Sequence, residues 1–161
     1  MLDTGEASVK GALQRARAGL RARLPAADRD RAPLPNSARE RHLVGRFADA
    51  FRRGDVDEVV ALLTDDALLT MPPLPLEYQG HEAIAAFLSY RAELRGALLV
   101  VTTRANTHPA LGLYLPDPQA AIARPFGLIV LTLEGDRIAA ITRFGDTALF
   151  GRFGLPPMLR S

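Results

Sequence analysis

Four polar side chains beyond residue 70 have the types that acid–base chemistry on a small molecule needs. They are Tyr78, Arg104, Arg143 and Asp146. An aspartate held beside an arginine can activate a water molecule and direct a proton to an epoxide oxygen, so these residues are the candidates if the chain is an enzyme. Their spacing matches no Asp-Arg-Asp cluster, and the favoured interpretation is that Arg143 and Asp146 form an ion pair at a strand edge facing solvent. The pattern therefore names candidates without assigning a reaction.

The other residues that bind metals or activate water do not form a recognisable arrangement. Asp65 and Asp66 stand between an expected helix and an expected strand, where short carboxylates commonly cap or turn the chain. His81 begins the sequence HEAIA, which lacks the second histidine of a zinc-binding H-E-x-x-H helix. The chain has no cysteine, which excludes disulfides and thiolate ligands. No metal and no cofactor is predicted.

Apolar side chains form a larger candidate set. A hollow with apolar walls and a few polar groups suits a small hydrophobic ligand, and Tyr78 or Arg104 could orient it. The residues that could line such a pocket are Phe47, Phe51, Met71, Leu74, Tyr78, Phe87, Ile129, Leu131 and Phe144. Each of these side chains could instead simply fill the core.

Helix signals come first along this part of the chain. Ser37 and Glu40 form an S-x-x-E capping box, which predicts a helix from residue 38 that ends at Gly54. Asp55 can cap a short helix over 56–63, and a further helix is expected over 81–94. The apolar residues of each helix recur at helical spacing, so each helix has one face to bury.

Strand signals dominate the rest. Apolar and polar residues alternate from residue 98 onward, and the residues 134–137, Glu-Gly-Asp-Arg, are typical of a tight hairpin turn. Strand and helix do not alternate as they do in parallel sheets. We therefore expect an α+β fold with three helices packed on a curved antiparallel sheet, preceded by a separate N-terminal helix.

The first 31 residues differ in charge from the rest. They carry seven basic and four acidic side chains, a local charge of +3 in a chain whose net charge is +2. Residues 7–24 have the periodicity of an amphipathic helix, and 25–37, with three prolines and alternating charges, read as a linker. A basic helix suggests a polyanionic partner, although a solvated basic face would look the same.

Residues 38–155 resemble a known family. The stretch HLVGRFADAFRRGDVDEVVALLTDDALLTMPP, continued by LEYQGHEAIAAFL, is similar to the SnoaL-like branch of the NTF2-like superfamily. The resemblance implies a cone-shaped α+β fold, with residues 156–161 as a tail. It says little about activity, because that superfamily includes isomerases, cyclases, epoxide hydrolases and non-catalytic sensors.

A second resemblance concerns the N-terminus. The sequence MLDTGEASVKGALQRARAGLRARLP is similar to the end of region 4 of extracytoplasmic-function (ECF) sigma factors, several groups of which carry a C-terminal SnoaL-like domain. In a helix-turn-helix the second helix enters the major groove, so Lys10, Gln14 and Arg15 would face the groove, and Arg17 or Arg21 would contact a phosphate. Only a short turn precedes this helix in the sequence. Residues 1–24 are therefore expected to be a remnant that binds DNA weakly alone.

The resemblances favour a regulator over an enzyme. An alignment with ketosteroid isomerase, a relative of the same fold, places Phe47, Met71 and Ile129 at the positions of its catalytic acids and base. None of the three has a transferable proton, so that activity is not expected. We expect a regulatory or ligand-sensing domain of a sigma factor that modulates transcription initiation but is not a complete sigma factor. The alternative is a small enzyme of the polyketide cyclase, isomerase or epoxide hydrolase type acting on a hydrophobic substrate.

The family also implies partners and a location. In full-length members the partners are RNA polymerase core and promoter DNA, and a homodimer through the sheet is an open alternative. No apolar run reaches the roughly 20 residues that cross a bilayer, and the N-terminus lacks a signal-peptide pattern. A cytoplasmic protein without membrane contact is expected.

Overall fold

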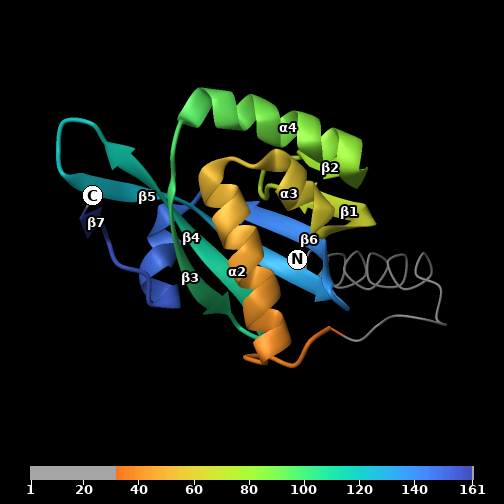
Figure 1. Cartoon of the computed structure of the whole chain (residues 1–161). Helices are drawn as coiled ribbons and strands as arrows, with labels where there is room; N and C mark the ends of the chain where they lie inside the picture. The colour runs from red at the N-terminus through yellow and green to blue at the C-terminus, as the bar shows by residue number, and fades with distance from the viewer. Residues whose placement is uncertain (1–31, 161) are drawn as a thin grey trace, which may run out of the picture. The chain divides into compact units, whose positions relative to one another are not determined.

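The structure is a computed structural model that describes residues 32–160 (Figure 1). The predictions for the N-terminal helix, for most of the linker and for the DNA-contacting residues Lys10, Gln14, Arg15 and Arg17 lie outside the described residues.

Three α-helices start close to where the local signals place them, although the helix expected over 56–63 ends at residue 61, and a 3-10 helix that was not expected follows the last long strand. These are α2 (Ala38–Arg53), α3 (Val56–Ala61), α4 (Gly80–Arg95) and η1 (Thr147–Phe153). The Ser37 hydroxyl accepts the Glu40 N–H, and Gly54 ends α2 in the left-handed conformation with φ 70°. Asp55 caps α3 by accepting the Glu58 N–H. These caps confirm the predicted starts of α2 and α3.

The strands form a single sheet of seven members. They are β1 (Leu63–Thr70), β2 (Glu77–Gln79), β3 (Leu99–Ala105), β4 (His108–Asp117), β5 (Ile122–Glu134), β6 (Arg137–Phe144) and β7 (Leu159–Arg160). Their order is β2-β1-β6-β5-β4-β3, with β7 pairing beside β5. The hairpin turn predicted at 134–137 joins β5 to β6, where Glu134 pairs with Arg137. The α+β class is confirmed.

The expectation of a wholly antiparallel sheet was wrong at one pair, because β1 runs parallel to β6. Hairpins fix the alternating directions of β3 through β6, but β1 and β6 are distant in sequence and no turn constrains their pairing. The absence of strand-helix-strand alternation predicts only how neighbours in sequence pair. The sheet is therefore mixed.

Asp65 and Asp66 also differ from expectation, since they lie within β1 and not in a turn. The ladder between β1 and β6 has an irregularity between Leu63 and Leu68, and both aspartates are exposed there. An irregular strand can turn successive polar side chains toward solvent.

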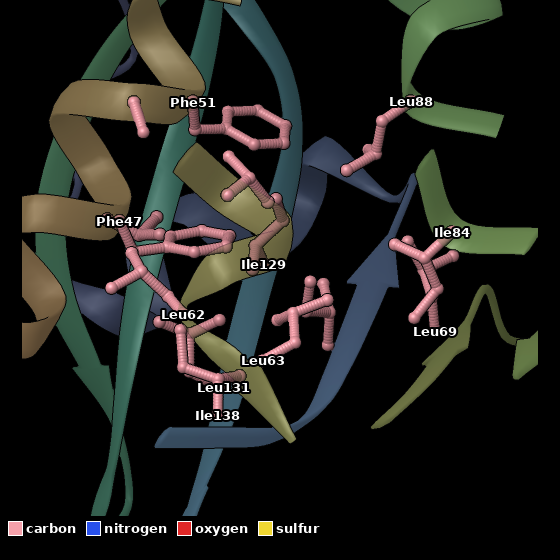
Figure 2. Packing of buried hydrophobic residues seen from close by; sticks show 14 of the residues in the cluster. Phe47, Phe51, Leu62, Leu63, Leu69, Ile84, Leu88, Ile129, Leu131 and Ile138 are labelled. Atoms are coloured by element: carbon pink, nitrogen blue, oxygen red, sulfur yellow. The ribbon is translucent and has the colours of Figure 1, made fainter. Parts of the chain in front are cut away.

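Apolar side chains pack on both faces of the sheet. On the helix side, α2, α3 and α4 contribute Phe47, Val59 and Ile84 to a cluster with Ile129 and Leu131 of β5 (Figure 2). We call the sheet surface that carries Ile129 and Leu131 the inner face, and the opposite surface the outer face. No helix within residues 32–160 is long and apolar enough to cross a bilayer.

The C-terminal segment covers part of the outer face. Tyr114, fully buried, meets the ring of Phe150 edge-on at 5.2 Å and donates its hydroxyl proton to the carbonyl of Pro156 at 2.8 Å. A side chain in place of Gly112 would come within 2.8 Å of Leu155, so glycine is needed for this approach. Residues beyond 155, expected as a tail, pair with β5 through Leu159.

We expect Phe47→Ala to lower the free energy of unfolding by about 3–5 kcal/mol, because a fully buried ring is replaced by a cavity. Urea denaturation followed by circular dichroism measures this. Leu74→Ala, at a side chain that is 59% exposed, is the control and should change stability by less than about 0.5 kcal/mol. Equal losses in the two variants would contradict the packing described here.

Candidate functional site

The predicted pocket residues mostly meet on the inner face, where they pack against one another. Phe47, Phe51, Met71, Ile129 and Leu131 are all buried in the inner cluster. The rings of Phe47 and Phe51 stack with centroids 5.6 Å apart, and Figure 2 shows both rings directed toward Ile129. Their side chains fill the middle of the inner face as a core.

Tyr78 and Phe87 lie at the border of this core. Tyr78 of β2 and Phe87 of α4 stack with ring centroids 4.5 Å apart, and both are partly buried. Tyr78 faces inward because it pairs with Leu69, a buried inner-face residue of β1. Tyr78 is thus a polar candidate that packs directly against the inner cluster.

The structure does not bring Leu74 and Phe144 to the inner face. Leu74 belongs to the turn between β1 and β2 and is largely exposed. Phe144 pairs with Leu128 and packs in the outer cluster. The reason is an irregularity in the β5–β6 ladder. Because of it, Ile138 and Ile141 lie on the same face although they are three positions apart. Side chains after the irregularity therefore point to the face opposite to the one that regular alternation predicts, and Phe144 is one of them.

Arg104 has a partner that the sequence did not indicate. Its guanidinium makes an ion pair with Glu40, with Nη1 and Oε1 2.6 Å apart, and the Glu40 side chain is only 5% exposed. The Asn36 N–H also donates to Glu40 Oε1 at 3.0 Å. Arg104 donates further to the carbonyl of Thr107. The pair therefore ties the start of α2 to the end of β3.

Glu40 is ionised in this setting. Burial alone acts to raise the pKa of Glu40, but hydrogen bonds from Arg104 and the Asn36 amide, together with the charges of Arg104 and Arg41, outweigh it and leave the pKa below its ordinary value. Because both oxygens already accept hydrogen bonds, this carboxylate is poorly placed to take a proton from a substrate.

Two open hollows adjoin this ion pair. One, of about 490 Å³, lies between α2 and β3 and includes Val44, Thr102 and Arg104 in its walls. The other, of about 220 Å³, is bordered by residues 32–35 and His108. Glu40 contributes to both. A third hollow of about 340 Å³ lies on the outer face, where Phe144, Val130 and Phe153 line it.

Arg143 and Asp146 do not form the ion pair considered from the sequence. Asp146 caps η1 by accepting the Ala148 N–H at 2.9 Å. Arg143 lies over the ring of Phe126, 5.0 Å from its centroid, and donates to the Phe126 carbonyl at 3.3 Å. The two candidates thus have separate roles, and the structure shows no catalytic cluster that joins them.

The histidines do not assemble a metal site. His81 Nε2 lies 3.0 Å from the carbonyl oxygen of Thr64, so its ring links α4 to β1. Within residues 32–160, no group of three or more histidine or acidic side chains is placed to hold a metal ion.

Comparison with known proteins relates the chain to a family. A family model described as SnoaL-like domain matches residues 44–112. The ECF RNA polymerase sigma factor SigG of Mycobacterium tuberculosis (strain ATCC 25618 / H37Rv) is 35% identical over 160 residues, covering 98% of this chain and 42% of that protein. The chain is related to the ECF sigma factors and carries a SnoaL-like domain. It spans less than half of the length of these curated relatives.

Solved structures share the fold of this SnoaL-like domain. An NTF-2 like protein of unknown function from Burkholderia xenovorans LB400 is 15% identical, with a TM-score of 0.54 over 65% of this chain and 80% of that chain. An LEH-like epoxide hydrolase of M. tuberculosis is 21% identical, with a TM-score of 0.53 over 71% of this chain and 87% of that chain. The likeness establishes the NTF2-like architecture.

Sequence reasoning assigned Glu40 only a capping role and missed its ion pair with Arg104. One signal was present, because Glu40 lies on the same side of α2 as Leu43 and Phe47, three and seven positions away, and so points toward the sheet. An acidic residue within an apolar stripe needs a buried partner. The identity of that partner, 64 residues away, could not be read from local spacing.

Replacing Glu40 in the SnoaL-like domain should cost about 3 kcal/mol of unfolding free energy at neutral pH, because Glu40→Gln leaves the Arg104 charge without its partner. Because the pKa of Glu40 is lowered in the folded state, its contribution is present above the unfolded pKa and disappears as the pH falls through the folded value. The difference between wild type and Glu40→Gln should therefore stay constant from pH 7 down to about the ordinary carboxyl pKa value of 4.5 and shrink as the pH falls further.

Denaturant titrations at several pH values measure this difference. Glu58→Gln is the matched control, since Glu58 pairs with Arg53 at 2.6 Å at a more exposed site and should cost less than about 1 kcal/mol. A difference for Glu40→Gln that is independent of pH would show that its charge does not stabilise the domain.

Proposed function

We propose that this chain is the regulatory or ligand-sensing part of a sigma factor, in which the SnoaL-like domain modulates transcription initiation without catalysing a reaction. In this proposal the domain occupies residues 38–155. Residues 25–37 are the linker, and residues 1–24 are the remnant of the region 4 recognition helix.

The composition of the inner face is the observation that carries the proposal. Phe47, Met71 and Ile129, at the positions where a related isomerase would need proton-transferring groups, are apolar and at most 6% exposed. Glu40 is the single buried charged side chain among those described in residues 32–93 and 96–160, and Arg104 neutralises it. General acid–base catalysis needs a group free to exchange a proton beside the substrate. The inner face offers no such group near Phe47.

The relationship to SigG supports the choice of partners. A sigma factor works with RNA polymerase core and promoter DNA, so these are the partners proposed for the protein in which this domain functions, and its place of action would be the cytoplasm. A homodimer, the other partner expected from the sequence, would bury the part of the outer face around Val130, Thr132 and Thr142.

The first prediction from this proposal concerns catalysis. We expect the purified chain to turn over neither a ketosteroid nor a panel of epoxides above the uncatalysed rate, because the buried Phe47, Met71 and Ile129 have no proton to transfer at the positions where the related isomerase needs one. Gas chromatography of the products measures this. Turnover abolished by Arg143→Ala or Asp146→Ala would favour the enzyme alternative.

The second prediction concerns transcription. A chimera of SigG in which this chain replaces the matched segment should support run-off transcription from a SigG-dependent promoter with core polymerase. Removing residues 32–161 from the chimera should change the transcript yield several-fold, because the domain that shifts the activity of the sigma factor is then lost. Identical yields with and without these residues would contradict a regulatory role.

A further inference from the structure

Two arginines lie on facing elements at the border of the inner face. Arg143 of β6 pairs with Ile129 across the ladder, so its side chain leaves the sheet on the side that α4 covers. Arg91 of α4 follows Ile84 and Leu88 at seven and three positions, which places it on the helix side that packs on the sheet. The positive charge of Arg91 is near enough to help lower the pKa of Arg143, after the larger effect of burial.

Contacts with neighbouring residues fix the position of the Arg143 guanidinium. Its guanidinium lies 5.0 Å from the centroid of the Phe126 ring, and Nη2 donates to the Phe126 carbonyl at 3.3 Å. A Cβ at Gly127 would come within 3.2 Å of Nη2 and 3.4 Å of Cζ, so this glycine leaves the space that the guanidinium occupies. The side chain is only partly buried, so it remains in contact with solvent.

The charge of this pair is unbalanced. Within residues 32–160, no carboxylate lies at ion-pairing distance from Arg91 or Arg143, whereas Arg104 has Glu40 and Arg53 has Glu58. Burial and the neighbouring charge of Arg91 lower the pKa of Arg143. A bound anion would offset both effects, because it supplies the missing counter-charge and accepts hydrogen bonds in place of water.

We propose that Arg91 and Arg143 form a binding site for the acidic group of a small amphipathic molecule, such as a carboxylate or sulfonate, whose apolar body lies against Phe126. Guanidinium groups suit this role since they bind oxyanions through two parallel hydrogen bonds and stay charged at neutral pH. A ligand held by both residues would join α4 to β6. This inference names a ligand class for the proposed sensing function and to that extent rests on it.

A pair of fluorescent probes tests the site. 8-Anilinonaphthalene-1-sulfonate carries an aromatic body and a sulfonate, and N-phenyl-1-naphthylamine has the same rings without the sulfonate. We expect Arg143→Gln and Arg91→Gln each to raise the dissociation constant of the sulfonate probe about tenfold, because one charge-assisted hydrogen-bonding group is lost. Neither variant should change binding of the uncharged probe. Fluorescence titration of the full chain measures both constants.

Arg152→Gln is the matched control, because it removes an exposed positive charge from η1, which packs on the outer face. It should leave both constants unchanged. Thermal unfolding checks that each variant is folded. If Arg143→Gln does not fold, the result for Arg91→Gln decides, because α4 keeps its buried residues in that variant.

Three results would overturn the site. They are unchanged sulfonate binding in Arg91→Gln and Arg143→Gln, an equal loss in Arg152→Gln, and an equal loss for the uncharged probe. The first excludes the two arginines, the second indicates attraction to net charge, and the third indicates altered apolar packing. The titrations contain no polymerase and are independent of the transcription experiment. A chimera that shows no regulation would contradict the proposed function but not the binding site. A titration that shows no binding would contradict the site but not the regulatory function.

Discussion

Phe47 is fully buried between α2 and the sheet, where it stacks on Phe51 and meets Ile129 of β5, and the arrangement of the inner face follows from this contact (Figure 2). An aromatic ring at this depth fixes how far the helix stands from the strands. Two turns before Phe47, on the same side of α2, Glu40 forms an ion pair with Arg104 at the end of β3. The apolar contact thus sets the spacing of α2, and the ion pair sets its position along the sheet.

The inner face consequently has three zones with different chemistry. One end holds the neutralised pair of Glu40 and Arg104, and the middle is closely packed hydrocarbon. The border near α4 holds Arg91 and Arg143, which have no acidic partner within residues 32–160. This distribution is the basis of our proposal that the domain holds a molecule or a neighbouring surface and does not convert a substrate. The same architecture occurs in an epoxide hydrolase, which shows that the fold itself does not decide the question.

Local signals predicted the parts of the fold that depend on neighbouring residues. The caps at Ser37, Gly54 and Asp55 and the turn before Arg137 all require only short stretches of sequence. Long-range features were not accessible in this way. The parallel pairing of β1 with β6, the partner of Glu40 and the side to which Phe144 points depend on register between distant segments. A single irregularity in the β5–β6 ladder was enough to reverse the placement of Phe144, because alternation along a strand cannot reveal where it is interrupted.

The C-terminal segment has a consequence for the handling of this protein. Phe150 and Leu155 lie over Tyr114 and Gly112, and Leu159 extends the cover by pairing with β5. If these residues were clipped by a protease or displaced by a bulky fusion, a strip of sheet rich in aromatic and aliphatic groups would meet water with its hydrogen-bonding edge open. Such strips promote self-association. Residues 150–160 therefore keep this part of the outer face out of contact with water and with other copies of the chain.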